Sequence, residues 1–227
     1  MKILVINPGS TSTKLAVYND LEPAWRESLF HSAEELSVFH HVNEQYAFRR
    51  DHIMEALRVA NIPMEFDAII ARGGLLKPTP GGVYRIDEHI KHDLWNADME
   101  HVSNLAAIIA DELAASIGCQ AFIADPVVTD ELRDVARLTG IPEIERISIF
   151  HALNSRAVSR KYAAREGRRY EDMNLIVAHL GGGISVSAHQ RGKVVDVNNA
   201  LNGEGPFSPE PVSYTHLRAH ETSLHLV

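Results

Sequence analysis

The chain has 227 residues, of which 45% are hydrophobic and 23% are charged, a composition typical of globular rather than disordered proteins. The formal net charge of −8 argues against nucleic acid as a partner, because phosphate backbones are bound mainly by an excess of Lys and Arg. The single cysteine excludes an intramolecular disulfide, and no apolar run resembles a signal peptide or a membrane span, so we expect a cytoplasmic protein with no membrane partner.

The first part of the chain predicts strands followed by a long helix. Three strands are expected, at 2–7, 13–19 and 24–30. A helical pattern then runs from Ser32, which opens a capping box with Glu35, to about Asn61. The spacing of its apolar residues predicts a core face made of Tyr46, Ile53, Met54, Leu57 and Val59.

The rest of the chain predicts crossover helices and then a second set of strands. A buried strand is expected at 66–71, a loop at 77–82, a helix at 99–117 ending at Gly118, a strand at 120–124 and a helix at 151–166. Hairpin strands return at 174–180, 183–189 and 193–198. This return indicates a second, incomplete copy of the opening unit, within an α/β fold that has helices against a mixed sheet.

Two short turns rich in glycine and serine each join two predicted strands. The first is Asn7–Lys14 and the second is His179–Ser185. Small residues let the backbone approach an anion, and successive N–H groups supply donors. Each turn alone is equally well explained as an ordinary glycine-rich hairpin. Because the two occupy equivalent hairpins, they favour a pair of polyphosphate-binding turns, although neither has the spacing of a P-loop or of a dinucleotide fingerprint.

Six sequence blocks resemble those of the butyrate kinases, a branch of the acetate kinase family within the superfamily of sugar kinases, Hsp70 and actin. The blocks, which occur in the family's order, are Asn7–Lys14, Ala71–Pro78, Ala124–Thr129, Ser148–Asn154, His179–Ser185 and Asn202–Glu210, and the resemblance covers essentially residues 1–210. The resemblance implies a ribonuclease H-like (actin-like ATPase) domain at 1–172. It also implies that 173–210 forms the opening hairpins of a truncated C-terminal domain.

The resemblance also implies a reaction. A short-chain fatty acid kinase of this kind transfers the γ-phosphoryl group of ATP to butyrate, giving butanoyl phosphate and ADP, with Mg²⁺ as cofactor and commonly as a homo-oligomer. One alternative is a kinase for acetate, propionate or a branched-chain acid. The other is a non-catalytic actin-like regulator that binds nucleotide.

Three catalytic residues are implied, each at the end of a predicted strand or at a strand–helix junction. Arg72 has a guanidinium suited to a carboxylate or a phosphoryl group, and two glycines after it that leave room for a ligand. Asp125 would organise magnesium through water, and His151 would donate to the γ-phosphoryl group in the transition state. The alternatives are a surface ion pair for Arg72, a helix cap or turn for Asp125 and a structural hydrogen bond for His151. A weaker block, His101 with Asn104, is left open.

The two turns are implied to hold the nucleotide. Asn7, Ser10, Ser12 and Lys14 would face the transferring phosphate, with Asn7 also near the metal, although Lys14 could instead be a solvated strand residue. The outer phosphates of ATP would lie against the second turn, at His179, Gly181, Gly182 and Gly183.

The end of the chain departs from the family pattern. The arginine expected after Glu210 is replaced by Pro211, and residues 211–227 resemble the translation of a sequencing-library adapter. We therefore expect an artefactual tail, the alternative being a genuine amphipathic one. Without the arginine and the second half of the cleft, this polypeptide is expected to be nearly or wholly inactive.

Overall fold

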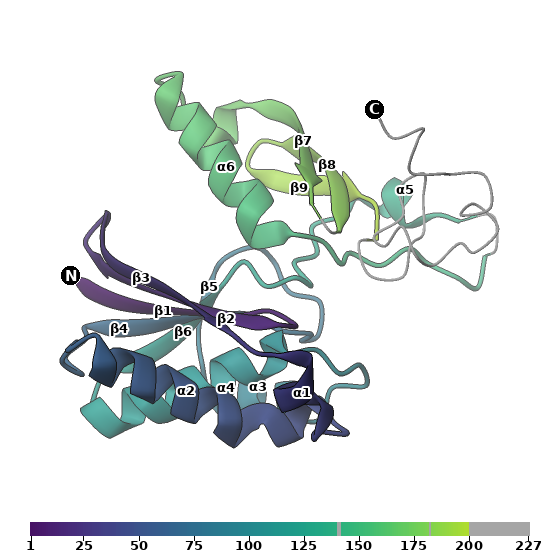
Figure 1. Ribbon diagram of the computed structural model, residues 1–227. Helices are drawn as coiled ribbons and strands as arrows, with labels where there is room; N and C mark the ends of the chain where they lie inside the picture. Colours follow the sequence, from purple (N-terminus) through teal and green to yellow (C-terminus); the bar gives the residue numbers. More distant parts are fainter. Residues whose placement is uncertain (140–141, 182, 200–227) are drawn as a thin grey trace, which may run out of the picture. The chain divides into compact units, whose positions relative to one another are not determined.

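The computed structural model describes residues 1–139, 142–181 and 183–199 (Figure 1). The chain divides into two compact units. The first comprises Met1–Lys77 and Gly82–Pro126, and the second comprises Pro78–Gly81 and the residues from Val127 onward. The domain boundary expected at 172/173 lies inside the second unit and stays a prediction. The expected tail at 211–227 lies outside the described residues.

The first unit contains a six-stranded mixed sheet with the strand order β3-β2-β1-β4-β6-β5. Its strands are β1 (Lys2–Pro8), β2 (Ser12–Asn19), β3 (Glu22–Phe30), β4 (Ala68–Arg72), β5 (Val83–Arg85) and β6 (Gln120–Ala124). The first three strands form an antiparallel meander, whereas β1, β4 and β6 are parallel to one another. All the strands expected in this part of the chain are present, and β5, only three residues long, was not predicted.

The helices of the first unit are α1 (Ala33–Ser37), the short 3₁₀ helix η1 (Val42–Glu44), α2 (Gln45–Val59), α3 (Glu88–Trp95) and α4 (Ser103–Ile117). In Figure 1, α2, α3 and α4 lie together along one side of the sheet. The side chains of Leu105, Ile109 and Leu113 on α4 are buried, at the i, i+4, i+8 spacing of one helix face. The helix ends at Gly118, whose φ of 74° is a left-handed conformation that favours glycine.

The single long helix predicted from Ser32 to Asn61 is wrong. The capping box at its start is present, because Ser32 Oγ accepts from the Glu35 amide at 3.1 Å and Glu35 Oε2 accepts from the Ser32 amide at 2.7 Å. The helix nevertheless stops at Ser37. The carboxylate of Glu44 accepts hydrogen bonds from the His40 and His41 amides at 2.7 and 3.3 Å. These bonds stabilise the non-helical segment that separates α1 from α2.

The predicted core face of this helix is also wrong in part. Ile53 and Leu57 are buried, but Met54 and Val59 are exposed. The third fully buried residue of α2 is Arg49, four positions before Ile53. A pattern of apolar residues could not reveal it, because a charged side chain is normally assigned to the solvent face of a helix.

The second unit contains a three-stranded antiparallel sheet, β7-β8-β9. Its elements are α5 (Asp134–Arg137), α6 (Ala152–Arg165), the 3₁₀ helix η2 (Tyr170–Asp172), β7 (Asn174–Leu180), β8 (Ile184–Gln190) and β9 (Lys193–Val197). The predicted helix and hairpin strands are confirmed, and α5 was not predicted. Like β1-β2-β3, the strands form an antiparallel meander whose second pairing is interrupted by a register shift, at Val17/Tyr18 in one and at Ala188/His189 in the other. This likeness supports the inference that the second meander begins another copy of the unit.

Candidate functional site

The first glycine- and serine-rich turn connects β1 to β2. The pairs Asn7 with Lys14 and Pro8 with Thr13 close the antiparallel ladder, and the Gly9 amide donates to the Ser12 carbonyl at 2.7 Å across the turn. Asn7, Ser10 and Lys14 are exposed and Ser12 is half-buried. The polar groups predicted to face a phosphate are therefore accessible to a ligand.

Strand register brings three of the predicted residues to one edge of the sheet. Ile6 pairs with Ala71, and Ala71 pairs with Ile123, in adjacent parallel strands. The residues that follow are therefore neighbours at the carboxyl ends of β1, β4 and β6: Asn7, Arg72, and Ala124 with Asp125. Neighbouring strands lie about 4.8 Å apart, so the outer members of this row are about 10 Å apart at the backbone. This edge is where ligands bind in open α/β sheets.

Asp125 combines burial with an unusual backbone conformation. The residue is 4% exposed, its φ is 37°, and its amide donates to the Gly82 carbonyl at 2.8 Å. A residue other than glycine rarely adopts a positive φ, still more rarely before a proline, and the cost is about 1–3 kcal/mol. Such conformations cluster at functional sites.

Arg72 is half-buried, and burial lowers the pKa of its guanidinium. The nearby His101 is neutral at neutral pH, because burial, and then the positive charge of Arg72, lower the pKa of its imidazole. His101 Nδ1 accepts from the Ser103 amide at 3.2 Å, which assigns the proton of the neutral ring to Nε2. The weaker pair His101 and Asn104 thus lies beside Arg72.

The expectation that Gly73 and Gly74 leave room for a ligand is wrong. A Cβ on Gly73 would lie 2.7 Å from the Cβ of Pro126, and a Cβ on Gly74 would lie 2.3 Å from Asn104 Oδ1. Asn104 Oδ1 also accepts from the Leu75 amide at 2.9 Å. The two glycines admit other parts of the protein rather than a substrate.

The second unit brings His151 and His179 into a stacked pair. Their ring centroids are 3.8 Å apart and the rings are inclined by 9°. Ser185 Oγ is 2.7 Å from His151 Nδ1 and accepts from the His151 amide at 3.3 Å. The Asn154 side-chain nitrogen lies 2.7 Å from His179 Nδ1. Asn154 and Ser185 therefore fix the two rings, a positioning role that sequence reasoning did not assign to either.

The second turn joins β7 to β8. The Gly181 amide donates to the Gly183 carbonyl at 3.2 Å, and a Cβ on Gly181 would lie 3.3 Å from His179 Nε2. The predicted contact at Gly182 lies outside the described residues. Because Arg72 and Asp125 belong to the first unit and His151 to the second, their convergence on one substrate stays a prediction.

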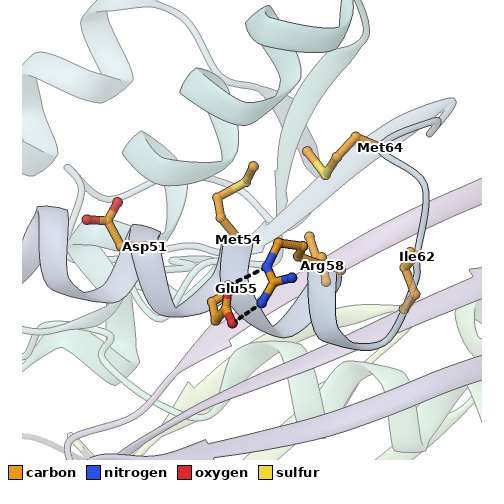
Figure 2. A pocket seen from close by; sticks show the side chains of 7 residues that line it. Asp51, Met54, Glu55, Arg58, Ile62 and Met64 are labelled. Atoms are coloured by element: carbon orange, nitrogen blue, oxygen red, sulfur yellow. Dashed lines mark hydrogen bonds and ion pairs between the residues drawn. The ribbon is translucent and has the colours of Figure 1, made fainter.

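Two cavities in the described part of the chain contain none of the predicted site residues. The larger, of about 420 Å³, lies beside α2 and is lined by Asp51, Met54, Glu55, Leu57, Arg58, Ile62 and Met64. Figure 2 shows the ion pair of Glu55 and Arg58, 2.6 Å long, among these side chains. The smaller, of about 220 Å³, is lined mainly by strands β7–β9. Among the described residues no group of three His, Cys, Asp or Glu side chains could hold a metal ion.

Comparison with curated proteins gives extensive similarity over most of the chain. A probable butyrate kinase of Phocaeicola vulgatus is 69% identical over 210 residues, which cover 92% of this chain and 59% of that protein. Butyrate kinase 2 of Clostridium acetobutylicum is 52% identical over 211 residues, with coverages of 92% and 59%. The chain thus spans about three fifths of the length of these relatives.

Within the described residues, no helix has the length and apolar character needed to cross a membrane.

Solved structures support the fold. Acetate kinase from Porphyromonas gingivalis superposes with a TM-score of 0.63 at 18% identity, covering 86% of this chain and 56% of that one. A propionate kinase from Francisella tularensis gives a TM-score of 0.58 at 18% identity, with coverages of 87% and 57%. At these identities the likeness concerns the fold alone, and it confirms the predicted actin-like ATPase class. The model of the acetokinase family matches residues 143–203. Together with the sequence identities, this match shows that the chain is similar to the acetokinase family, and within it to the butyrate kinases.

Proposed function

We propose that this chain is part of a butyrate kinase, which transfers the γ-phosphoryl group of ATP to the carboxylate of butyrate. The observation that supports the proposal most is the row of Asn7, Arg72 and Asp125 at the carboxyl edge of β1, β4 and β6. The identity of 52–69% to butyrate kinases supports butyrate, rather than another short-chain acid, as the substrate.

In the proposed reaction a carboxylate oxygen of butyrate attacks the γ-phosphorus of ATP in line with the leaving oxygen. A new P–O bond forms to the acid, the bond to the β-phosphate oxygen breaks, and ADP leaves with the electron pair. Such transfers need positioning and charge neutralisation more than covalent help from the protein. Arg72 would orient the acid with its planar fork of donors, and His151 would donate to the charge that develops on the phosphoryl oxygens.

Asn7 and Asp125 fit a magnesium site by their chemistry, since both offer oxygen ligands at the same sheet edge. They would hold the ion through water, and the ion would supply charge neutralisation on the phosphates. Ser10, Ser12 and Lys14 would contact the phosphates from the first turn, and His179 with the glycines 181–183 from the second. In keeping with its family, the intact protein is proposed to be cytoplasmic and homo-oligomeric.

The test is a chimera in which residues 1–210 replace the matching part of the Phocaeicola vulgatus relative. Trapping the acyl phosphate with hydroxylamine should detect ATP-dependent butyryl transfer by the chimera and little or none by this chain. In the chimera, Asp125→Ala and Arg72→Ala should each lower kcat/KM by ~10²-fold or more, while the exposed Arg58→Ala should retain activity. Full activity in the first two variants would refute the site assignment.

The same assay separates the alternatives. Butyrate should be preferred over propionate by roughly 10–200-fold, the discrimination that one methylene gives in a hydrophobic pocket, and over acetate, which is two methylenes shorter, by more. If the chimera prefers one of the smaller or branched acids, the proposed phosphoryl transfer stands but butyrate is not the substrate. ATP binding without turnover of any acid would instead favour a nucleotide-binding regulator.

A further inference from the structure

The first turn is held from behind by a buried arginine on α2. Arg49 is 0% exposed, and four of its N–H groups have protein acceptors. Nη1 donates to the Gly9 carbonyl and to Thr13 Oγ1, both at 3.1 Å, and Nη2 donates to the Ser10 carbonyl at 3.0 Å. Nε donates to Gln45 Oε1 at 2.9 Å. Three of the four bonds therefore end on the turn.

These bonds determine which way the peptide groups of the turn face. In a trans peptide the carbonyl of one residue and the amide of the next point in opposite directions, and the described residues contain no cis peptide bond. Because the carbonyls of Gly9 and Ser10 point inward to Arg49, the amides of Ser10 and Thr11 point outward. Both residues are exposed, and neither amide donates to a protein acceptor in the described part of the chain.

The guanidinium also places a positive charge directly beneath the turn. Among the described residues no carboxylate lies within ion-pair distance of Arg49. The adjacent His31, 3.0 Å from Thr13 Oγ1, is neutral because burial and the charge of Arg49 lower its pKa to about 4. An uncompensated buried charge behind two outward amides favours an anion in front of them.

We propose that Arg49 is the positioning residue of the first turn: its guanidinium turns the carbonyls of Gly9 and Ser10 inward, and this turns the amides of Ser10 and Thr11 outward to receive a phosphate group of ATP. This inference rests on the proposed function, because it assigns the turn to the nucleotide. A purely structural arginine would stabilise α2 against the sheet without changing the affinity of the turn for an anion.

The experiment titrates the ¹⁵N-labelled full chain with inorganic tripolyphosphate and follows the amide signals of Ser10 and Thr11. Arg49→Met should weaken binding at least 10-fold. Arg49→Lys, which retains charge but cannot span both carbonyls with a planar fork, should weaken it at least 3-fold. Thr13→Val, which leaves both carbonyl bonds intact, should weaken it less than Arg49→Lys. Arg58→Met, an exposed arginine on the same helix, is the matched control and should bind within 2-fold of the wild type.

Several outcomes would overturn the proposal. Binding by folded Arg49→Met within 2-fold of the wild type would make Arg49 merely structural. If Arg49→Met does not fold, wild-type affinity of Arg49→Lys for tripolyphosphate would likewise show that Arg49 is merely structural. If the wild-type signals of Ser10 and Thr11 do not move at saturating tripolyphosphate, the turn is not an anion site and the inference fails. The butyrate kinase proposal would still be judged separately, by the hydroxamate assay on the chimera.

Discussion

Replacing Gly74 with alanine tests how closely the segment after Arg72 packs against α4. The new Cβ would lie 2.3 Å from Asn104 Oδ1, 2.7 Å from its Cα and 2.9 Å from its backbone nitrogen. Two of these three atoms are backbone at the start of α4, so a rotamer change cannot relieve the overlap. Either the helix terminus or the segment after β4 must move.

The expected cost follows from three contributions. Overpacking of a rigid site costs about 1–3 kcal/mol. Displacing Asn104 also breaks its bond to the Leu75 amide, 2.9 Å long, and leaving a buried polar group unpaired costs about 1–3 kcal/mol. Replacing glycine with alanine also lowers the conformational entropy of the unfolded chain, which stabilises the folded state by about 0.4–1 kcal/mol. We expect the first unit to lose about 2–4 kcal/mol of its free energy of unfolding.

Tryptophan fluorescence in a urea titration measures this change. Both tryptophans of the chain, Trp25 and Trp95, belong to the first unit, so the signal reports the unfolding of that unit. The matched control is Gly82→Ala, whose Cβ would meet nothing closer than a Tyr84 ring carbon at 3.7 Å. The control should be neutral or slightly stabilising. If Gly74→Ala unfolds within about 0.5 kcal/mol of the control, the packing argument is refuted.

Three further predictions concern buried polar groups. Because the folded-state pKa of His31 is lowered to about 4 from 6.5, the unfolded chain binds the proton first on acidification. The stability of the first unit should therefore fall from pH 6.5 toward 4, and His31→Phe should flatten this slope in urea titrations at several pH values. The Glu131 carboxylate forms a buried ion pair with Arg156 at 2.7 Å, so Glu131→Gln should destabilise the second unit by about 3 kcal/mol. Hydrogen exchange measures this change, and unchanged protection of the amides would contradict the prediction. Ser185→Ala should shift the ring-nitrogen signals of His151 and cost about 1 kcal/mol; an unshifted ring would show that the 2.7 Å bond does not hold it.

Local sequence signals were sufficient for most of the regular structure. The apolar run at 120–124 and the glycines after Ile117 and Glu166 predicted the positions of β6, α4 and α6, because strand periodicity and left-handed C-terminal residues are properties of a few adjacent residues. The same locality allowed the two turns to be recognised as equivalent. The sequence blocks also selected Arg72 and Asp125, since a charged side chain directly after a buried strand stands out from its apolar context.

Tertiary structure decided what depends on distant partners. The break before α2 arises because the Glu44 side chain caps the amides of His40 and His41, a choice that helical spacing alone does not reveal. The space at Gly74 is filled by Asn104, 30 positions later in the sequence. Arg49 has the pattern of a solvent-facing helix residue, and only the folded chain brings the carbonyls of the first turn over its guanidinium. Sequence periodicity shows only which residues are apolar. A buried charged group such as the guanidinium of Arg49 finds its hydrogen-bond partners only when the sheet and the helix pack together.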